Sequence, residues 1–407
     1  MNCRHCNTPL SQVFLDLGHA PPSNAYLDAA ALRAPEITYP LRILVCSDCK
    51  LVQTEDYAAA EEFFSPDYAY FSSTSRSWLD HAARYCAMIT ERLGLDAESL
   101  VIEVAANDGY LLRNFVAAGI PCLGIEPTDS TAIAAEALGI PIVREFFGEQ
   151  MGRRLTTEGR QADLICGNNV YAHVPDINDF TRGLAAVLKP EGVVTLEFPH
   201  LLRLIEECQF DTVYHEHFSY LALGVVARIF RAAGLRVFDV EELPTHGGSL
   251  RVYGCLPDAS YAESPAVARV LAEETRQGLD TLASYSQFQA RADAVKNGLL
   301  AFLLEAKRTG KSVAAYGAAA KGNTLLNYAG VKPDLIPYVY DAAPSKQNHF
   351  MPGSHIPILP PSELESRRPD YVLILPWNIA DEVRAQLAPL AEKGTKFVTA
   401  VPELKVM

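Results

Sequence analysis

The segment Val101-Ile102-Glu103-Val104-Ala105-Ala106-Asn107-Asp108-Gly109 determines the fold of this chain. A short apolar run followed by small residues, Asn, Asp and Gly predicts a buried strand that ends in a tight turn. Residues 110–118 continue as a predicted helix and residues 121–125 as a second strand. Alternation of strands and helices predicts an α/β domain with a parallel sheet.

An acidic residue stands where the second strand ends. At the place of Glu126, a carboxylate can accept hydrogen bonds from both ribose hydroxyls of an adenine nucleoside. The turn after the first strand lacks the Gly-x-Gly-x-x-Gly pattern that binds a dinucleotide, so the sequence favours S-adenosylmethionine, which has no phosphates. A third strand, residues 162–167, ends at the same sheet edge. The candidate cofactor-binding residues are Glu103, Ala105, Asn107, Glu126 and Asn168.

The sheet continues further along the chain. Residues 193–198 are expected to form a fourth strand and residues 222–233 an amphipathic helix. Residues 236–241 and 248–255 predict an antiparallel strand pair, which closes the sheet in many S-adenosylmethionine methyltransferases. Residues 262–310 are polar and poor in Pro and Gly, so we expect connecting helices without chemistry of their own.

Four cysteines near the N-terminus form two Cys-x-x-Cys pairs. They are Cys3, Cys6, Cys46 and Cys49. Each pair can grip a metal ion from a tight turn, and two pairs complete a tetrahedral thiolate site for zinc. Four thiolates leave no open coordination position, so we expect the zinc to be structural. The two pairs are further apart than in a short zinc finger, so the residues between them should fold on their own.

The segment Phe210-Asp211-Thr212-Val213-Tyr214-His215-Glu216-His217-Phe218-Ser219-Tyr220 concentrates groups that exchange protons. Phe210, Val213 and Phe218 predict that part of it is buried. A buried imidazole beside a carboxylate can titrate near neutral pH, as general acid–base catalysis requires. The alternative is a polar patch at a helix start. A metal site is not favoured, because the spacing differs from His-Glu-x-x-His.

Hydroxyl groups alternate with aromatic rings in Tyr68-Ala69-Tyr70-Phe71-Ser72-Ser73-Thr74-Ser75. Such a segment can cover a pocket and hydrogen-bond a polar ligand. The alternative is a loop that leads into the helix predicted over residues 77–93.

A second α/β unit begins at Ser312. Residues 313–317 predict a strand, and Ala318-Ala319-Ala320-Lys321-Gly322-Asn323-Thr324 a turn of small residues into a helix. Backbone N–H groups and one lysine can meet a phosphate at such a helix start. Residues 336–340, ending in Asp341, and residues 371–375 predict further strands. A nucleotide diphosphate is the expected ligand, and the alternative is a plain α/β fold with a solvated lysine.

The composition is that of a soluble globular protein, with 407 residues of which 49% are hydrophobic and 21% charged. This length predicts two or three domains. The net charge of −14 opposes a nucleic-acid surface, which needs a basic stripe. No run reaches the ~18 apolar residues of a membrane span, and the N-terminus has no apolar signal core. We therefore expect a cytoplasmic enzyme, a monomer or small homo-oligomer, without nucleic-acid or membrane partners.

These motifs together resemble the sugar C-methyltransferase family, of which the C-3′-methyltransferase of the tetronitrose pathway is the best-understood type. The motifs are the paired Cys-x-x-Cys, Tyr-Ala-Tyr-Phe-Ser-Ser, Glu-Val-Ala-Ala-Asn-Asp-Gly, Tyr-His-Glu-His-Phe-Ser-Tyr, His-Gly-Gly-Ser-Leu-Arg and Tyr-Gly-Ala-Ala-Ala-Lys-Gly-Asn. The resemblance covers essentially the whole chain. It implies a zinc-binding domain (residues 1–66), a central class I methyltransferase-like Rossmann domain (67–258), a helical connection (259–310) and a C-terminal Rossmann-like α/β domain (311–407).

The resemblance also implies ligands and roles. The family methylates nucleotide-linked 4-keto deoxysugars, commonly dTDP-linked, with S-adenosylmethionine. Its base falls on His217, with Tyr214 and Glu216 beside it. A further active-site histidine falls on His173, and a tyrosine lid on Tyr68 or Tyr70. The family's sugar contacts do not carry over, so the substrate-binding candidates come from this chain's own residues: His215, His246, Lys321, Asn323 and Asp341.

One departure from the family concerns the cofactor turn. The family usually has glycine where Ala105 stands, and the methyl group there can crowd the methionine half or shift it slightly.

Carbon methylation requires a carbanion, which a ketone provides because its oxygen takes up charge as an enolate. We expect His217 to remove the proton, Tyr214 or His173 to stabilise the oxygen, and Glu216 to orient an imidazole. One rival is an epimerase or lyase that makes the same enolate without methyl transfer, and Ala105 keeps it open. The other is a zinc-ribbon regulatory protein, which the negative charge opposes.

Overall fold

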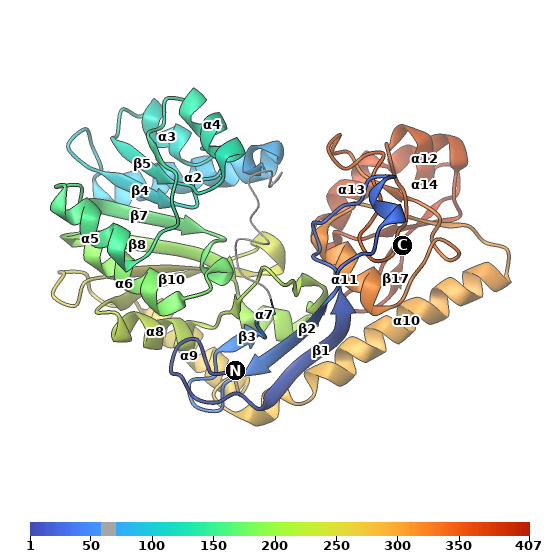
Figure 1. Cartoon of the computed structure of the whole chain (residues 1–407), viewed down its shortest axis with the longest axis horizontal. Coiled ribbons are helices and arrows are strands. Elements are labelled where there is room, and N and C mark those ends of the chain that lie inside the picture. Colours follow the sequence, from blue (N-terminus) through green and yellow to red (C-terminus); the bar gives the residue numbers. More distant parts are fainter. Residues whose placement is uncertain (58–70) are drawn as a thin grey trace.

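The computed structural model describes residues 1–57 and 71–407, and these residues form an α/β protein with three sheets. Figure 1 shows the two larger sheets in separate units side by side, with strands β1 and β2 and the long helix α10 below them. The fold class expected from the sequence is thereby confirmed.

The smallest sheet combines two distant parts of the chain. Its order is β1-β2-β3-β9, with all neighbours antiparallel. Phe14, Leu15 and Leu17 of β1 are buried, which anchors the sheet on the core. Its last strand comes from the proton-transfer segment, because Val52 pairs with Tyr220. The elements are β1 (Gln12–Ala20), η1 (Ala31–Arg33), β2 (Tyr39–Val45), β3 (Val52–Thr54) and β9 (Ser219–Tyr220).

The central sheet has the order β10-β11-β8-β7-β4-β5-β6. The five strands from β8 to β6 are parallel, and β10 and β11 form the expected antiparallel pair. Val101, Ile102 and Val104 are buried, as a parallel strand covered on both faces requires. The strands are β4 (Val101–Val104), β5 (Cys122–Ile125), β6 (Ile142–Val143), β7 (Ala162–Asn168), β8 (Leu188–Pro199), β10 (Arg236–Leu243) and β11 (Ser249–Cys255).

Helices cover both faces of this sheet (Figure 1). The α-helices are α2 (Arg76–Leu93), α3 (Leu112–Ala117), α4 (Asp129–Ala137), α5 (Glu149–Thr157), α6 (Ile177–Val187), α7 (Leu201–Glu206) and α8 (Leu223–Ala232). Short 3-10 turns carry several candidate site residues: η2 (Ser72–Thr74), η3 (Tyr171–His173), η4 (Phe210–Thr212) and η5 (Thr245–Gly247).

Helices α9 (Pro265–Arg276) and α10 (Phe288–Arg308), with η6 (Leu282–Tyr285), connect the two large sheets. The ring of Phe288 stacks on Phe14 with a centroid distance of 4.6 Å, which fastens α10 to β1. Residues 262–310 are thus largely helical, as the sequence predicted. No helix of residues 1–57 and 71–407 combines the length and apolar character that crossing a membrane needs.

The C-terminal sheet has the order β14-β13-β12-β15-β16-β17, parallel except for the last pair. The strand predicted over residues 336–340 is shorter than expected, because Pro337 has no N–H to donate to a sheet. The elements are β12 (Val313–Tyr316), α11 (Ala320–Tyr328), β13 (Val339–Tyr340), β14 (Ile358–Leu359), α12 (Ser362–Arg367), β15 (Tyr371–Ile374), η7 (Trp377–Ile379), α13 (Ala380–Gln386), α14 (Ala388–Ala391), β16 (Lys396–Thr399) and β17 (Lys405–Val406).

Candidate active site

The four cysteines of the two Cys-x-x-Cys pairs come together beside the small sheet. Their sulfur atoms all lie within 4.8 Å of one another. Cys3 and Cys49 are 3.5 Å apart, and Cys6 and Cys46 are 3.4 Å apart. A tetrahedral site with Zn–S bonds of about 2.3 Å places its sulfurs about 3.8 Å apart. The four thiolates therefore fit a closed, structural zinc site.

The first zinc-binding turn also touches two segments of the candidate active site. The Arg4 guanidinium donates to the carbonyl of Pro175 at 2.9 Å, two residues after His173. The same guanidinium lies 4.9 Å from the centre of the Phe218 ring, next to His217. Loss of zinc should therefore disturb both histidine-bearing segments.

Unsatisfied polar groups gather where β4 and β7 end. Both carboxylate oxygens of Glu103 and both polar atoms of the Asn168 amide are buried and have no hydrogen-bond partner among residues 1–57 and 71–407. Burial, together with the charges of Glu126 and Asp108, raises the pKa of Glu103. Buried polar atoms without partners are costly and mark a place for a ligand. A carboxylate and an amide here fit the ammonium and carboxylate of the methionine half of S-adenosylmethionine.

Glu126 lies directly after β5 and uses only part of its hydrogen-bonding capacity. Its two carboxylate oxygens accept from the N–H groups of Asn107 and Thr128, each at 2.9 Å. A carboxylate offers about four lone-pair positions. The remaining two positions fit the two hydroxyls of a ribose.

The turn after β4 carries a non-glycine residue in a glycine conformation. Ala105 has a φ of 59°, and Asn107 has a φ of 49°. Asparagine tolerates the left-handed region, but for alanine this conformation costs about 1–2 kcal/mol of conformational free energy. Asn107 also accepts from the N–H of Ser72 at 2.9 Å, so its side chain ties the turn to η2, which precedes α2.

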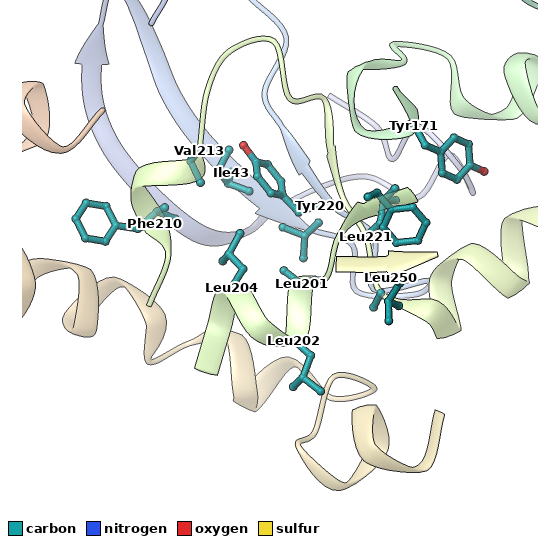
Figure 2. Close-up of a cluster of buried hydrophobic side chains, with 14 of the residues drawn as sticks. Ile43, Tyr171, Leu201, Leu202, Leu204, Phe210, Val213, Tyr220, Leu221 and Leu250 are labelled. Carbon is teal, nitrogen blue, oxygen red and sulfur yellow. The ribbon is translucent and has the colours of Figure 1, made fainter. Parts of the chain in front are cut away.

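Buried apolar side chains anchor the proton-transfer segment on the hydrophobic core. Figure 2 shows Phe210, Val213 and Tyr220 in one cluster with Ile43 of β2 and Leu204 of α7. Phe210 and Val213 are fully buried, and Phe218 is 3% exposed, as the sequence predicted.

Hydroxyl groups from the N-terminal and C-terminal parts of the chain fix its backbone. Thr54 of β3 donates to the carbonyl of His217. Thr324 of α11 donates to the carbonyl of Val213 at 2.9 Å. The segment thus lies where all three parts of the chain meet.

The hydrogen bond of the His217 ring defines its tautomer. Nδ1 lies 3.0 Å from the carbonyl oxygen of Thr212. A carbonyl only accepts, so Nδ1 carries the hydrogen and Nε2 carries the lone pair. Burial, followed by the neighbouring His173, His246 and Lys321, holds the pKa of His217 well below its usual range. The ring is therefore neutral near pH 7 and presents a proton acceptor. Its centre lies 4.5 Å from that of Tyr214 and 4.6 Å from that of His173.

His173 has the same tautomer. Its Nδ1 donates to the backbone carbonyl of Glu216 at 3.0 Å. Burial lowers the pKa of His173 to about 4, so Nε2 carries a lone pair at neutral pH. A neutral ring in this state cannot donate from Nε2. The expectation that His173 stabilises an oxyanion does not fit this hydrogen bond.

The Glu216 carboxylate contacts Asn24 and no imidazole among the hydrogen bonds of the described residues. It accepts from the Asn24 amide at 2.9 Å, and burial raises the pKa of Glu216 to about 7. Backbone carbonyls orient the rings of His217 and His173. The expectation that Glu216 orients an imidazole does not fit these hydrogen bonds, because a backbone carbonyl and not this carboxylate holds each ring.

A lysine of the C-terminal domain reaches this histidine cluster. The Lys321 ammonium donates to Asn378 at 2.7 Å and lies 4.6 Å from the centre of the Trp377 ring. The Trp377 indole donates to the buried Asp211 carboxylate at 2.7 Å. Burial raises the pKa of Asp211 to about 6.

The loop of η5 brings His246 to the same place. His246 Nε2 lies 3.0 Å from the Asn169 amide nitrogen and accepts its hydrogen. Burial lowers the pKa of His246 to about 4. The backbone is left-handed at His246, with a φ of 54°. Thr245 holds this loop by donating to the buried Glu197 carboxylate at 3.0 Å.

A second polar cluster surrounds the turn after β12. The Ala318 carbonyl accepts from Lys346 at 2.8 Å and from Tyr26 at 2.5 Å. The Asp341 carboxylate accepts from the Ala318 N–H at 2.6 Å. Asp341 thus lies at the expected strand end, where it fixes the turn.

Two predicted substrate residues make contacts within the chain instead. The Asn323 amide is fully buried and donates to the carbonyl of Ser23 at 2.7 Å. His215 Nε2 lies 3.3 Å from the carbonyl of Tyr39 on β2. We therefore omit both from the substrate site proposed below.

Two predicted site residues cannot be placed, and three residues near the site were not predicted from the sequence. Tyr68 and Tyr70 lie outside the described residues. Tyr26, Lys346 and Trp377 were not among the predicted site residues. The sequence could have indicated Trp377 as a site residue, because it follows a strand at the ligand-binding edge of a parallel sheet.

Three family models match successive parts of the chain. They are "Putative zinc binding domain" over residues 3–64, "Methyltransferase domain" over residues 78–240 and "C-methyltransferase C-terminal domain" over residues 244–402. The C-methyltransferase NovU of Streptomyces niveus is 33% identical over 405 residues, which cover 100% of this chain and 96% of NovU.

Two further similarities are partial. The uncharacterized methyltransferase ML2584 of Mycobacterium leprae (strain TN) is 27% identical over 99 residues, 24% of this chain and 36% of that protein. A solved structure of the 1,6-didemethyltoxoflavin-N1-methyltransferase of Burkholderia thailandensis is 19% identical. It covers 51% of this chain and 96% of its own, with a TM-score of 0.37.

Proposed function

We propose that this chain, which belongs to the C-methyltransferase family, methylates a carbon atom next to the 4-keto group of a nucleotide-linked deoxysugar. As a family member it is an S-adenosylmethionine-dependent C-methyltransferase with a zinc-binding domain. The epimerase or lyase and the zinc-ribbon regulator therefore no longer stand as alternatives. The keto sugar, its nucleotide and the roles of individual residues are the proposal.

The observation that carries the proposal is the tautomer of His217. Its Nε2 lone pair belongs to a half-buried, neutral ring among polar side chains from all three parts of the chain. A neutral imidazole is the usual general base at neutral pH. Methylation of oxygen or nitrogen can use a lone pair of the acceptor, whereas methylation of carbon needs a proton removed first. A histidine that is held as a neutral base beside the cofactor-binding domain therefore supports methylation of a carbon atom.

The proposed reaction has two steps. Nε2 of His217 takes the proton from the carbon next to the ketone, the C–H electron pair becomes a C=C bond, and the carbonyl electron pair moves to oxygen. S-adenosylmethionine supplies a sulfonium methyl group, which the enolate carbon takes while the C–S pair stays on sulfur. Glu103, Asn168 and Glu126 would hold this cofactor at the edge of the central sheet.

The residues of the C-terminal domain favour a nucleotide as the part of the substrate that this domain binds. Lys346 is half-buried and lies beside Tyr26, with its ammonium 5.3 Å from the centre of that ring. Burial lowers the pKa of Lys346, and the neighbouring Asp341 opposes that shift. A lysine kept close to an aromatic ring and a helix start suits a diphosphate. We assign the diphosphate to Lys346.

The test is incubation with methyl-labelled S-adenosylmethionine and a dTDP-linked 4-keto-6-deoxyhexose. The proposal expects label on carbon, identified by a new C–CH₃ signal in the NMR spectrum of the product. The matched control is the same sugar nucleotide reduced to the 4-hydroxyl, which cannot form an enolate. Labelling of the reduced sugar, or of oxygen, would refute the proposal.

A further inference from the structure

The proposed enolate chemistry needs an electrophile at the ketone oxygen. The pKa of His217 lies well below its usual range, so this base is weak. A weak base forms an enolate only when a strong partner stabilises the oxygen. His173 cannot be that partner, because its hydrogen is on Nδ1 and is donated to Glu216.

We propose that the ammonium group of Lys321 contacts the 4-keto oxygen and stabilises the enolate oxyanion. Lys321 is then a catalytic residue, and the C-terminal domain supplies part of the catalytic centre. This inference rests on the proposed function, because it assigns a role within the same reaction.

Packing between the domains places Lys321 at the histidine cluster. Lys321 stands three residues before Thr324, whose hydroxyl holds the Val213 carbonyl of the segment that carries His217. Beneath the ammonium, the Trp377 ring packs against the η5 loop, where a Cβ on Gly247 would lie 2.6 Å from the ring. Gly247 follows His246, so Lys321 lies between the His217 and His246 segments.

The electrostatics agree with this placement. The charge of Lys321 contributes to the lowered pKa of His217 and to that of His246. Burial lowers the pKa of Lys321, whereas the Asp211 carboxylate opposes that shift and the Trp377 ring favours the charged ammonium. One carboxylate oxygen of Asp211 is buried without a partner among the described residues.

A phosphate contact, which the sequence suggested for Lys321, fits less well. In a nucleotide-linked sugar, the diphosphate and the 4-keto group lie on opposite sides of the ring. A lysine that acts on the base belongs at the keto side. Lys346 lies instead at the Tyr26 and Ala318 cluster, where it donates to the Ala318 carbonyl at 2.8 Å.

Tyr214 is the remaining neighbouring donor, and it complements Lys321. Its ring centre lies 4.5 Å from that of His217. Burial and nearby carboxylates raise the pKa of Tyr214, so the hydroxyl is a neutral donor. Charge-assisted hydrogen bonds are roughly twice as strong as neutral ones, so the cation should supply the larger share.

The test separates the two lysines. Exchange of the hydrogen next to the ketone is measured in deuterated water with a dTDP-linked 4-keto-6-deoxyhexose, and dTDP affinity is measured by calorimetry. Lys321→Met should lower the saturating exchange rate about 10²–10³-fold, as loss of an oxyanion donor does. Its dTDP affinity should stay within about twofold, well under 1 kcal/mol. Lys346→Met should instead weaken dTDP binding. Exposed Lys307→Met should change neither.

Lys321→Arg keeps the charge and should exchange faster than Lys321→Met. Unchanged binding of S-adenosylhomocysteine would show that each variant is folded. The inference is overturned if Lys321→Met loses dTDP affinity but reaches the wild-type exchange rate at saturation. If wild-type protein shows neither exchange nor methylation, the proposed function itself fails, and this inference fails with it.

Discussion

The Nδ1–H group of His217 donates to the backbone carbonyl of Thr212 at 3.0 Å. This hydrogen bond leaves the Nε2 lone pair as the basic atom of the ring. The neighbouring His173 ring is held in the same way by the carbonyl of Glu216. A neutral imidazole with its hydrogen on Nδ1 cannot donate from Nε2, so a donor to the ketone oxygen must come from another residue.

The zinc site should be needed for the shape of the active site as well as for folding. We expect one zinc per chain, and Cys46→Ser should lose the metal and on the order of several kcal/mol of stability. Chelation should also reduce methyl transfer, because Arg4 and Thr54 support the His173 and His217 segments. Metal analysis and thermal unfolding check this, with buried Cys122→Ser as the control. Freshly prepared protein without zinc would contradict it.

Replacing Ala105 by glycine should stabilise the protein. Left-handed backbone costs alanine about 1–2 kcal/mol, whereas glycine loses about 0.4–1 kcal/mol through the flexibility of the unfolded chain. We expect a net gain of roughly 0.5–1 kcal/mol. The measurement is the midpoint of urea unfolding. The transition to compare is the one whose midpoint changes when S-adenosylhomocysteine is added, because that transition belongs to the cofactor-binding domain. The control is Ala106→Gly. Ala106 is the next residue and has no positive φ, so this change should destabilise the protein. A lower midpoint for Ala105→Gly would disprove the strain.

Glu126→Ala should weaken cofactor binding selectively. Loss of charge-assisted hydrogen bonds to a ribose costs about 1.5–3 kcal/mol, or roughly 10- to 100-fold in affinity. Calorimetry with S-adenosylhomocysteine measures this loss, and dTDP affinity should stay unchanged. Glu136→Ala removes an exposed acid of α4 that pairs with Arg144 and serves as the control. Equal cofactor affinity in both variants would remove Glu126 from the cofactor site.

Glu216 should make stability depend on pH. Burial raises the pKa of Glu216 to about 7, from 4.5. The unfolded chain therefore loses this proton more readily. The stabilising contribution of the protonated group is complete below about pH 4.5 and disappears as pH rises through 7.

Glu216→Gln keeps the buried group neutral, so its stability relative to wild type should rise between these two pH values. The gain is about 1.4 kcal/mol per pKa unit. Urea unfolding at several pH values measures it. Glu55→Gln should show the opposite trend and only below about pH 4.5, because Arg42 lowers the pKa of Glu55 from 4.5. A gain for Glu216→Gln that does not change with pH would contradict the assignment.

The sheets could be predicted because their strands are apolar runs with few alternatives. Val101 to Val104 is a continuous buried strand, and the turn after it carries its own Asn and Gly signals. The strand predicted over residues 336–340 is reduced to Val339–Tyr340, because Pro337 cannot donate a hydrogen bond to the sheet. The left-handed conformation of Ala105 could not be predicted, because alanine carries no signal for it.

The active site was predictable only where its residues are neighbours in sequence. Tyr214 and His217 belong to one segment, whose crowding of proton-transfer groups indicates a site. The partners that define the chemistry are distant or carry no signature. Backbone carbonyls orient both histidines. Trp377 is 166 residues from Asp211. Thr54 and Thr324 hold the segment from opposite ends of the chain.

The most direct test of the account is proton exchange without a methyl donor. In deuterated water with a dTDP-linked 4-keto-6-deoxyhexose, wild-type protein should exchange the hydrogen next to the ketone. His217→Asn keeps a donor for the Thr212 carbonyl but lacks the basic nitrogen. It should lose about 10²–10⁴ in exchange rate, the usual contribution of a general base. His217→Ala should lose as much, and Glu126→Ala should keep exchange but lose methylation. Exchange at the wild-type rate in His217→Asn and His217→Ala would show that the base lies elsewhere.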